Sequence, residues 1–229
     1  KWRNSPVCIK KYDLVMDEET QIVSNNSRIA NAKTFILNNK KLLITIFTLI
    51  ILTIFGYFFY KEFEKKNRIK LSETYNNIIT NFELDNKEDV TKELKEIIYK
   101  KDKTYSPLAL YFLIDNSLIN SKEEINKYFN IIIEETKLEK EIKNLIIYKK
   151  ALYNSEFETE QNLLSILNPL INSESVWKSH ALFLMAEYFF SKGEKQKSRE
   201  FFQKILELKD ANQNILLDTQ KRIIRDFSE

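Results

Sequence analysis

The chain has 229 residues, with only 2 Gly and 3 Pro, and its formal net charge is +3. Sheet-rich folds usually need more glycine at tight turns, so this scarcity favours helices joined by short loops. Residues 61–229 carry 28 basic and 29 acidic side chains, a balance of −1. A nucleic-acid-binding domain normally shows a strong basic surplus, so the composition argues against a nucleic-acid partner.

The residue types needed for catalysis are scarce. Cys8 is the only cysteine and His180 the only histidine, which leaves no Ser-His-Asp or Cys-His set and no cysteine-based zinc site. Two glycines cannot form a phosphate-binding loop. Adjacent glutamates such as Glu123 and Glu124 point about 100° apart on a helix, which is typical of a solvated face rather than an acid–base pair. We therefore predict no enzymatic activity, no cofactor, no metal and no small-molecule substrate.

Residues 1–41 carry 8 basic and 4 acidic side chains and are predicted to be an N-terminal cytoplasmic segment. The sequence begins at Lys1, and a polar stretch consistent with a short helix follows Met16. We expect the natural start to be Met16, with residues 1–15 as an upstream extension.

Residues 42–60 form an uncharged apolar run of 19 residues. As a helix this run would extend about 28 Å, close to the roughly 30 Å hydrocarbon core of a bilayer. Tyr57, Phe58, Phe59 and Tyr60 crowd its second end, where an aromatic belt would lie. The alternatives are a buried core helix and a cleaved signal peptide, whose apolar region usually has about 7–15 residues and ends at small residues. The length of the run and its aromatic end favour an uncleaved transmembrane helix.

Residues 61–229 show nine apolar stripes at helical spacing, separated by short polar breaks. In chain order these stripes comprise Leu71, Tyr75, Ile78, Ile79 and Phe82; Val90, Leu94, Ile97 and Ile98; Leu108, Ala109, Phe112 and Leu113; Ile125, Tyr128, Phe129, Ile132 and Ile133; Ile142, Leu145, Ile146 and Leu152; Leu163, Ile166, Leu167 and Leu170; the segment from Val176 to Ser191; Phe201, Phe202, Ile205 and Leu206; and Ile215, Leu216, Ile223, Ile224 and Phe227. The seventh segment is apolar on nearly every side, so we expect it to be central.

Boundary signals accompany several of these helices. Ser106 is predicted to be an N-cap, with Pro107 in the first helical turn. Ser121 and Glu124 have the spacing of a capping box. Gly193 is predicted to end the seventh helix in the left-handed conformation.

Equivalent points recur at a nearly constant interval. Ala109, Ile146 and Ala181 begin the apolar middles of three helices, at intervals of 37 and 35 residues, and tetratricopeptide repeats have a period near 34 with two helices each. The last full unit fits best, at Met185, Ala186, Phe189, Gly193, Ser198, Phe202 and Ile205. We predict an all-α fold, in which a single N-terminal transmembrane helix precedes a degenerate tetratricopeptide-repeat-like α-solenoid of antiparallel helix pairs. An ordinary helical bundle is the alternative.

The stretch from Leu163 to Asp210 carries a family resemblance. Its Leu-x-Pro-Leu at residues 167–170, its Trp177 after a short loop and its Lys-Gly-Glu turn at residues 192–194 resemble the membrane-anchored repeat proteins of the YfgM type, ancillary subunits of the SecYEG translocon, in their alphaproteobacterial form. The resemblance covers residues 16–229. It implies a scaffold or chaperone-like role at the inner membrane, with translocon subunits or periplasmic chaperones as partners and no catalytic residues.

A stack of helix pairs leaves a concave face that holds peptide segments. Candidates to line this face are Tyr75, Tyr111, Tyr148 and Tyr188, and the alternative is that these tyrosines pack between helices with their hydroxyls at the edge. We therefore predict a protein-interaction scaffold that contacts lipid through residues 42–60. The alternative function is that of a structural envelope protein in a cell-division or outer-membrane maintenance complex.

The predicted topology places the N-terminus in the cytoplasm and residues 61–229 in the periplasm. Residues 22–41 contain four basic side chains and residues 61–80 contain five, so the positive-inside rule leans slightly the other way. Long domains translocate largely regardless of charge, however, and the resembled family has this orientation. Alkaline phosphatase fused after Glu229 should be active, because the enzyme matures only outside the cytoplasm. An inactive but stably expressed fusion would place the domain inside.

Overall fold

The structure is a computed structural model that describes residues 33–83 and 86–227. Every regular element within these residues is a helix, which confirms the all-α prediction for the described part of the chain. The described part of the chain divides into two units, the first ending at residue 66 and the second beginning at residue 67. The expected start at Met16 and the extension over residues 1–15 lie outside the described residues.

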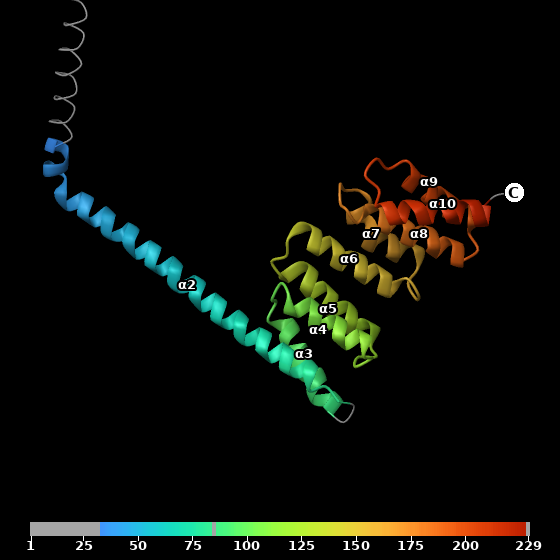
Figure 1. The fold of residues 1–229 in the computed structure, drawn as a ribbon, viewed down its shortest axis with the longest axis horizontal. Helices are drawn as coiled ribbons and strands as arrows, with labels where there is room; N and C mark the ends of the chain where they lie inside the picture. Colours follow the sequence, from blue (N-terminus) through green and yellow to red (C-terminus); the bar gives the residue numbers. More distant parts are fainter. Residues whose placement is uncertain (1–32, 84–85, 228–229) are drawn as a thin grey trace, which may run out of the picture. The chain divides into compact units, whose positions relative to one another are not determined.

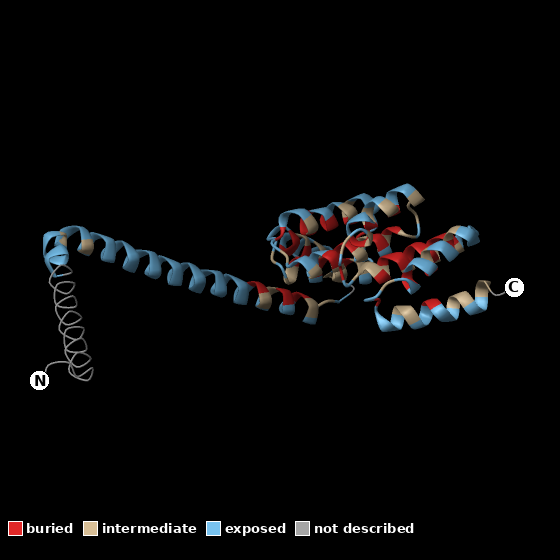
Figure 2. Cartoon of the chain, turned by 90° about the horizontal axis from the view of Figure 1, so that it is seen from above, coloured by how far each residue is buried: buried red, intermediate tan, exposed pale blue. Residues whose placement is uncertain are grey.

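Helix α2 (Lys40–Thr80) is an uninterrupted helix of 41 residues. It contains the run 42–60, whose large side chains are exposed, and no part of its most apolar stretch is buried (Figure 2). A core helix of a globular domain would be mostly covered, so the exposure argues against the buried-core alternative. Helix α2 is thus one exposed apolar helix that is long enough to cross a membrane once. Its last turns, from Leu71 onward, carry buried side chains of the second unit.

The second unit continues with eight more helices, each packed against the next along the chain (Figure 1). They are α3 (Lys87–Tyr99), α4 (Tyr105–Asp115), α5 (Lys122–Glu135), α6 (Lys140–Asn154), α7 (Glu160–Ile171), α8 (Lys178–Ser191), α9 (Lys195–Leu206) and α10 (Gln213–Phe227). Together with the last turns of α2, they correspond one by one to the nine predicted stripes. The sequential packing of helix pairs is therefore as predicted.

The predicted end of α8 at Gly193 is confirmed. Gly193 has a φ of 77°, a conformation that costs glycine little because it lacks a Cβ. Its N–H donates to the Phe190 carbonyl at 3.0 Å, and the Glu194 N–H donates to the Phe189 carbonyl at 2.9 Å. These two bonds form a Schellman motif, which satisfies carbonyls that the helix end would otherwise leave open.

The capping box at the start of α5 is confirmed in one of its two bonds. The Ser121 hydroxyl accepts a hydrogen bond from the Glu124 N–H at 3.1 Å. The Glu124 carboxylate does not complete the box but accepts from the Tyr128 hydroxyl at 2.7 Å and pairs with the Lys95 ammonium at 2.7 Å. The Glu124 carboxylate, which would complete the capping box, thus binds Lys95 of α3 instead.

The predicted N-cap at Ser106 is wrong. Helix α4 begins at Tyr105, two residues earlier than predicted, with Thr104 at the N-cap position, and the Asp102 carboxylate accepts hydrogen bonds from the Thr104 and Tyr105 N–H groups at 2.8 Å each. Ser106 is buried inside the first turn, and its hydroxyl donates to the Ile97 carbonyl of α3 at 3.0 Å. The carboxylate therefore does the capping, while the serine joins two helices.

Helix α6 buries Ile146 as predicted, but its buried face is rotated from the predicted stripe. Ile142 and Leu152 are exposed, whereas Ile147 and Ala151 are in the core. The cause is that two polar side chains share the buried face. Asn144 donates to the Ser175 hydroxyl at 3.0 Å, and Asn154 exchanges two amide hydrogen bonds with Asn126 of α5, at 2.8 and 2.9 Å. A stripe drawn through apolar residues alone misses such paired amides.

Four other apolar positions also lie outside the core. Leu108, Leu206 and Ile224 are exposed, and so is Val176, because α8 begins at Lys178 after a turn. Leu108, Val176 and Leu206 each neighbour a buried position, and Ile224 follows the half-buried Ile223. The predicted helices are therefore present, and their buried faces are rotated slightly.

Helix α8 is central within the second unit, as predicted. It packs against α6, α7, α9 and α10, and eight of its residues are buried. Phe202 on α9 is wholly buried, with its ring 5.5 Å from that of Phe183 and 6.0 Å from that of Phe227. The small buried residues Ala186 and Ser198 let α8 and α9 cross closely beside it.

We expect Phe202→Ala to lower the free energy of unfolding by about 3–5 kcal/mol, since it removes a buried aromatic ring and leaves a cavity. Leu206→Ala on the same helix is the matched control and should cost less than about 1 kcal/mol, because Leu206 is 42% exposed. Chemical denaturation of both variants measures the difference. Equal losses would show that the inward face of α9 is misassigned.

Candidate binding groove

Two of the four candidate tyrosines are buried between helices. The Tyr75 ring lies 5.6 Å from the Tyr105 ring, and burial raises the pKa of Tyr75. The Tyr188 hydroxyl donates to the Glu158 carbonyl at 3.1 Å. Both side chains make contacts that hold helices together, so neither presents its ring to a ligand.

The other two candidate tyrosines are partly exposed. Burial raises the pKa of Tyr111 to about 12, and its hydroxyl has no hydrogen-bond partner among the described residues. Tyr148 stacks on Trp177, with 5.8 Å between ring centroids. Tyr75 and Tyr111 belong to one core cluster and Tyr148 and Tyr188 to the next. The structure thus divides the four tyrosines between two clusters instead of gathering them on one surface.

His180 lies in an aromatic cluster where α6 meets the start of α8. Its ring is 5.7 Å from the Tyr148 ring and 5.0 Å from the Trp177 ring. Burial lowers the pKa of His180, and the Val176 carbonyl opposes this effect. The Trp177 indole donates to the Glu141 carbonyl at 3.1 Å. The cluster joins two helices, and the groups that contact the imidazole among the described residues are two aromatic rings and a backbone carbonyl.

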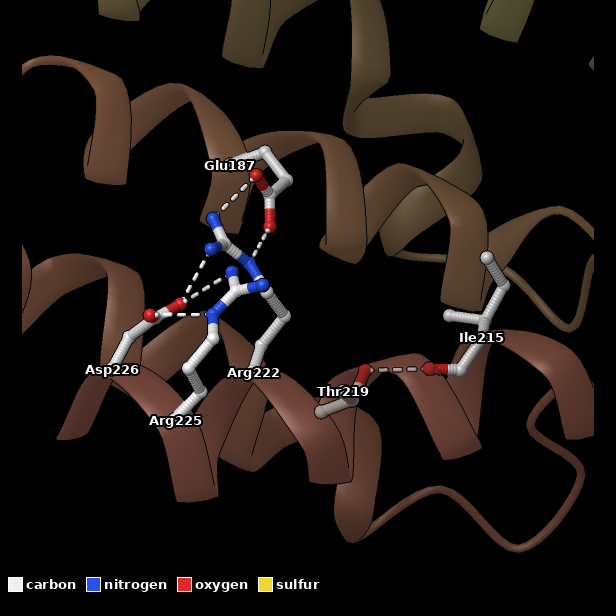
Figure 3. Close-up of polar contacts among 6 residues, drawn as sticks. All are labelled: Glu187, Ile215, Thr219, Arg222, Arg225 and Asp226. Carbon is white, nitrogen blue, oxygen red and sulfur yellow. Dashed lines mark hydrogen bonds and ion pairs between the residues drawn. The ribbon is translucent and has the colours of Figure 1, made fainter. Parts of the chain in front are cut away.

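Arg222 is the centre of a charged cluster that joins α10 to α8 (Figure 3). Its Nε and Nη2 atoms bond the two Glu187 carboxylate oxygens at 2.5 and 2.6 Å, and its guanidinium lies 4.4 Å from the Phe190 ring centroid. Asp226 contacts Arg222 and Arg225, and hydrogen bonding to Arg225 is the main cause of the lowered pKa of Asp226. Because each carboxylate faces a guanidinium, the cluster acts as a clamp and offers no free acid or base.

An open groove of about 640 Å³ lies between α3 and the loop that joins α4 to α5. Its lining is mainly charged and polar, with one large aromatic ring. The lining residues are Lys87, Glu88, Thr91, Lys92, Lys95, Glu96, Tyr99, Ser117, Leu118 and Asn120.

A polar network fixes the side chains along the groove. Lys95 pairs with Glu124 across the helices, and hydrogen bonding to Lys95 is the main cause of the lowered pKa of Glu124. The Tyr128 ring, whose hydroxyl bonds Glu124, packs edge-on against the Tyr99 ring at 5.8 Å. The Lys127 ammonium lies 5.8 Å from the Tyr99 ring centroid. Tyr99 is 48% exposed, so part of a positioned aromatic residue is open to a ligand.

The groove has the chemistry of a binding surface rather than of a reaction site. Glu88 and Glu96 are its two carboxylates, and eight residues of helix place them about 12 Å apart, too far to share a proton. No cysteine or histidine is among its lining residues. Ammonium groups, a carboxylate pair and an exposed tyrosine suit a peptide that brings charged and apolar side chains together.

A second hollow, of about 370 Å³, lies between the start of α5 and the end of α6 with the turn that follows it. Lys122, Leu152, Tyr153, Glu156 and Phe157 line it. The Lys122 ammonium lies 3.8 Å from the Phe157 ring centroid. Asn120 lines the first groove and Lys122 the second, so both hollows include residues at the start of α5.

Sequence reasoning missed the groove because its residues read as a solvated helix face. The signal was Tyr99, a large aromatic residue directly after the apolar stripe of α3 and outside it. Comparison with protein-family models, with curated proteins and with solved structures finds no match to this chain. The assignment of the groove therefore rests on its own geometry.

His180 predicts a pH dependence of stability. Its folded pKa lies below the ordinary value of 6.5, so the unfolded chain binds the proton first as the pH falls. The stability contributed by the neutral ring is complete above about pH 6.5 and is lost as the pH falls below that value. His180→Gln should remove this loss between about pH 7.5 and 5.5, a range above the titration of ordinary carboxylates.

Urea unfolding of the full chain in detergent at several pH values measures the effect. Since His180 is the only histidine, no second imidazole masks the result. Identical pH dependence in the parent protein and in His180→Gln would show that the ring is not held neutral by its burial.

Proposed function

We propose that this chain is a membrane-anchored scaffold for protein–protein interaction. Residues 42–60 cross the inner membrane once, the N-terminal segment is cytoplasmic, and the helical unit is periplasmic. The observation that carries the proposal is the open groove beside α3, which combines an exposed tyrosine with charged side chains held in place by neighbouring helices. Such surfaces bind extended or helical peptide segments.

We also propose that the helical unit is a degenerate tetratricopeptide-repeat-like solenoid. The closely crossed pair α8 and α9 supports this, because Ala186 and Ser198 are buried small residues beside Phe189 and Phe202, as in the repeat pattern. Helix α6 contacts α8 across α7, and α8 contacts α10 across α9, whereas in the first half α3 contacts α5 across α4. Contacts between alternate helices thus join odd-numbered helices in the first half and even-numbered helices in the second. The helix that begins each repeat therefore shifts by one near α5 and α6, which suits a degenerate array better than a uniform one.

The resemblance of residues 163–210 to the YfgM type favours translocon subunits, periplasmic chaperones or exported chains as partners. The groove supports this class because it has room for a peptide segment and has binding chemistry without catalytic groups. Neither the groove nor the clusters favour the structural envelope role by a specific observation, so the experiment that follows decides between the two.

A photo-reactive residue at the position of Lys92 should form adducts with a partner in intact membranes, because Lys92 lines the groove and is exposed. The matched control is the same residue at Gln220, an exposed position of α10, which should give no such adduct. Mass spectrometry of the adducts identifies the partner. Translocon subunits, periplasmic chaperones or exported chains support the proposal, whereas division or cell-wall proteins support the structural role. Equal adducts from both positions, or none from position 92, would contradict binding in the groove.

A further inference from the structure

Four basic residues lie close together at one edge of the helical unit, which we name the basic edge: Arg68, Lys100, Lys101 and Lys103. All four are exposed. The first belongs to α2 and the other three to the loop between α3 and α4. A hydrogen bond of 2.9 Å from Arg68 Nη2 to the Thr104 hydroxyl brings the two segments together.

The loop is held in one conformation that turns its acidic group inward. Lys101 has a left-handed φ of 54°, and its N–H donates to the Ile98 carbonyl at 3.1 Å. The Asp102 carboxylate accepts from the Thr104 and Tyr105 N–H groups. The one acid of this loop therefore caps α4, and the lysines around it face solvent.

Most of the positive charge on the basic edge is not neutralised. Lys101 pairs with Glu135 at 2.6 Å, with both side chains close to half exposed. Arg68, Lys100 and Lys103 have no ion pair within the described part of the chain, and Arg68 binds only the uncharged Thr104 hydroxyl.

The chain holds this charge close to the apolar run. Arg68 follows Tyr60, the last residue of the run, by only eight positions. Eight helical residues span about 12 Å, and even a fully extended chain would span at most about 29 Å. Lys61, Lys65 and Lys66 lie in the same interval. Whatever the angle between the two units, the basic edge is tethered within reach of a membrane that residues 42–60 enter.

We propose that the basic edge binds the phosphate groups of an acidic phospholipid surface and so draws the helical unit toward the membrane. Ammonium and guanidinium groups within about a Debye length of anionic lipid are attracted to it, and the attraction adds up over several residues. The proposal rests on the proposed insertion of residues 42–60, and it requires no protein partner. The left-handed φ of Lys101 and the inward carboxylate of Asp102 both leave the lysine side chains of this loop facing solvent, as lipid binding requires.

Lysine footprinting on the purified full chain in nanodiscs tests this. Nanodiscs of phosphatidylcholine are compared with nanodiscs that contain one third phosphatidylglycerol. Acetylation of Lys100 and Lys103 should fall at least about threefold in the acidic nanodiscs and recover in high salt. Lys192 and Lys209, exposed in the loops on either side of α9, are internal controls and should react equally in both.

A paired variant removes the charge and keeps the fold. Lys100→Gln with Lys103→Gln should abolish the lipid dependence of acetylation at Lys101, whereas Lys192→Gln with Lys209→Gln should leave it intact. Equal acetylation of Lys100 and Lys103 in both lipids would overturn the proposal, and so would protection that persists in high salt. Failure of the chain to enter nanodiscs at all would instead contradict the membrane anchor, so the two proposals fail in different ways.

Discussion

The run Leu42–Tyr60 exposes a helical surface of large apolar side chains that no described part of the chain covers. Leu, Ile, Phe and Val side chains each gain about 0.3–0.6 kcal/mol at the centre of a bilayer, whereas Lys, Arg and Asp lose about 2.5–3.5 kcal/mol there. The run contains the first kind and none of the second. A lipid bilayer would relieve this exposure, and we infer that the rest of the chain is organised around that contact.

A helical segment that lies in lipid adds no side chains to the core of the helical unit. That unit must therefore bury its apolar residues with its own helices. Residues 67–229 achieve this through neighbouring helices, so that three core clusters follow one another along the chain. Buried and half-buried polar groups pair between neighbouring helices. Asn126 and Asn154 pair between α5 and α6, and Glu187 and Arg222 pair between α8 and α10. Such bonds favour one register of the stack, because a shifted helix would leave buried polar groups unpaired.

Helix number and order could be predicted because apolar spacing reports burial directly, and Gly193 marked a helix end because a left-handed residue favours glycine. Which face of α6 is buried could not be predicted, since Asn144 and Asn154 read as solvated until their partners are known. The N-cap of α4 was misassigned for a related reason, because a local pattern does not show that Ser106 binds the Ile97 carbonyl of α3 and that the helix begins earlier, beside Asp102. The groove around Tyr99 depends on residues from three separate segments, and no local pattern joins them.

The contact of residues 42–60 with lipid is our central proposal. Alkaline carbonate extraction of membranes that contain the full-length protein tests it most directly. We expect the intact chain to stay in the membrane pellet, and a variant with Ile46→Lys and Ile50→Lys to move to the supernatant, because each lysine costs about 3 kcal/mol at the bilayer centre. Release of the unmodified chain, or recovery only of a soluble fragment that lacks residues 42–60, would contradict the account.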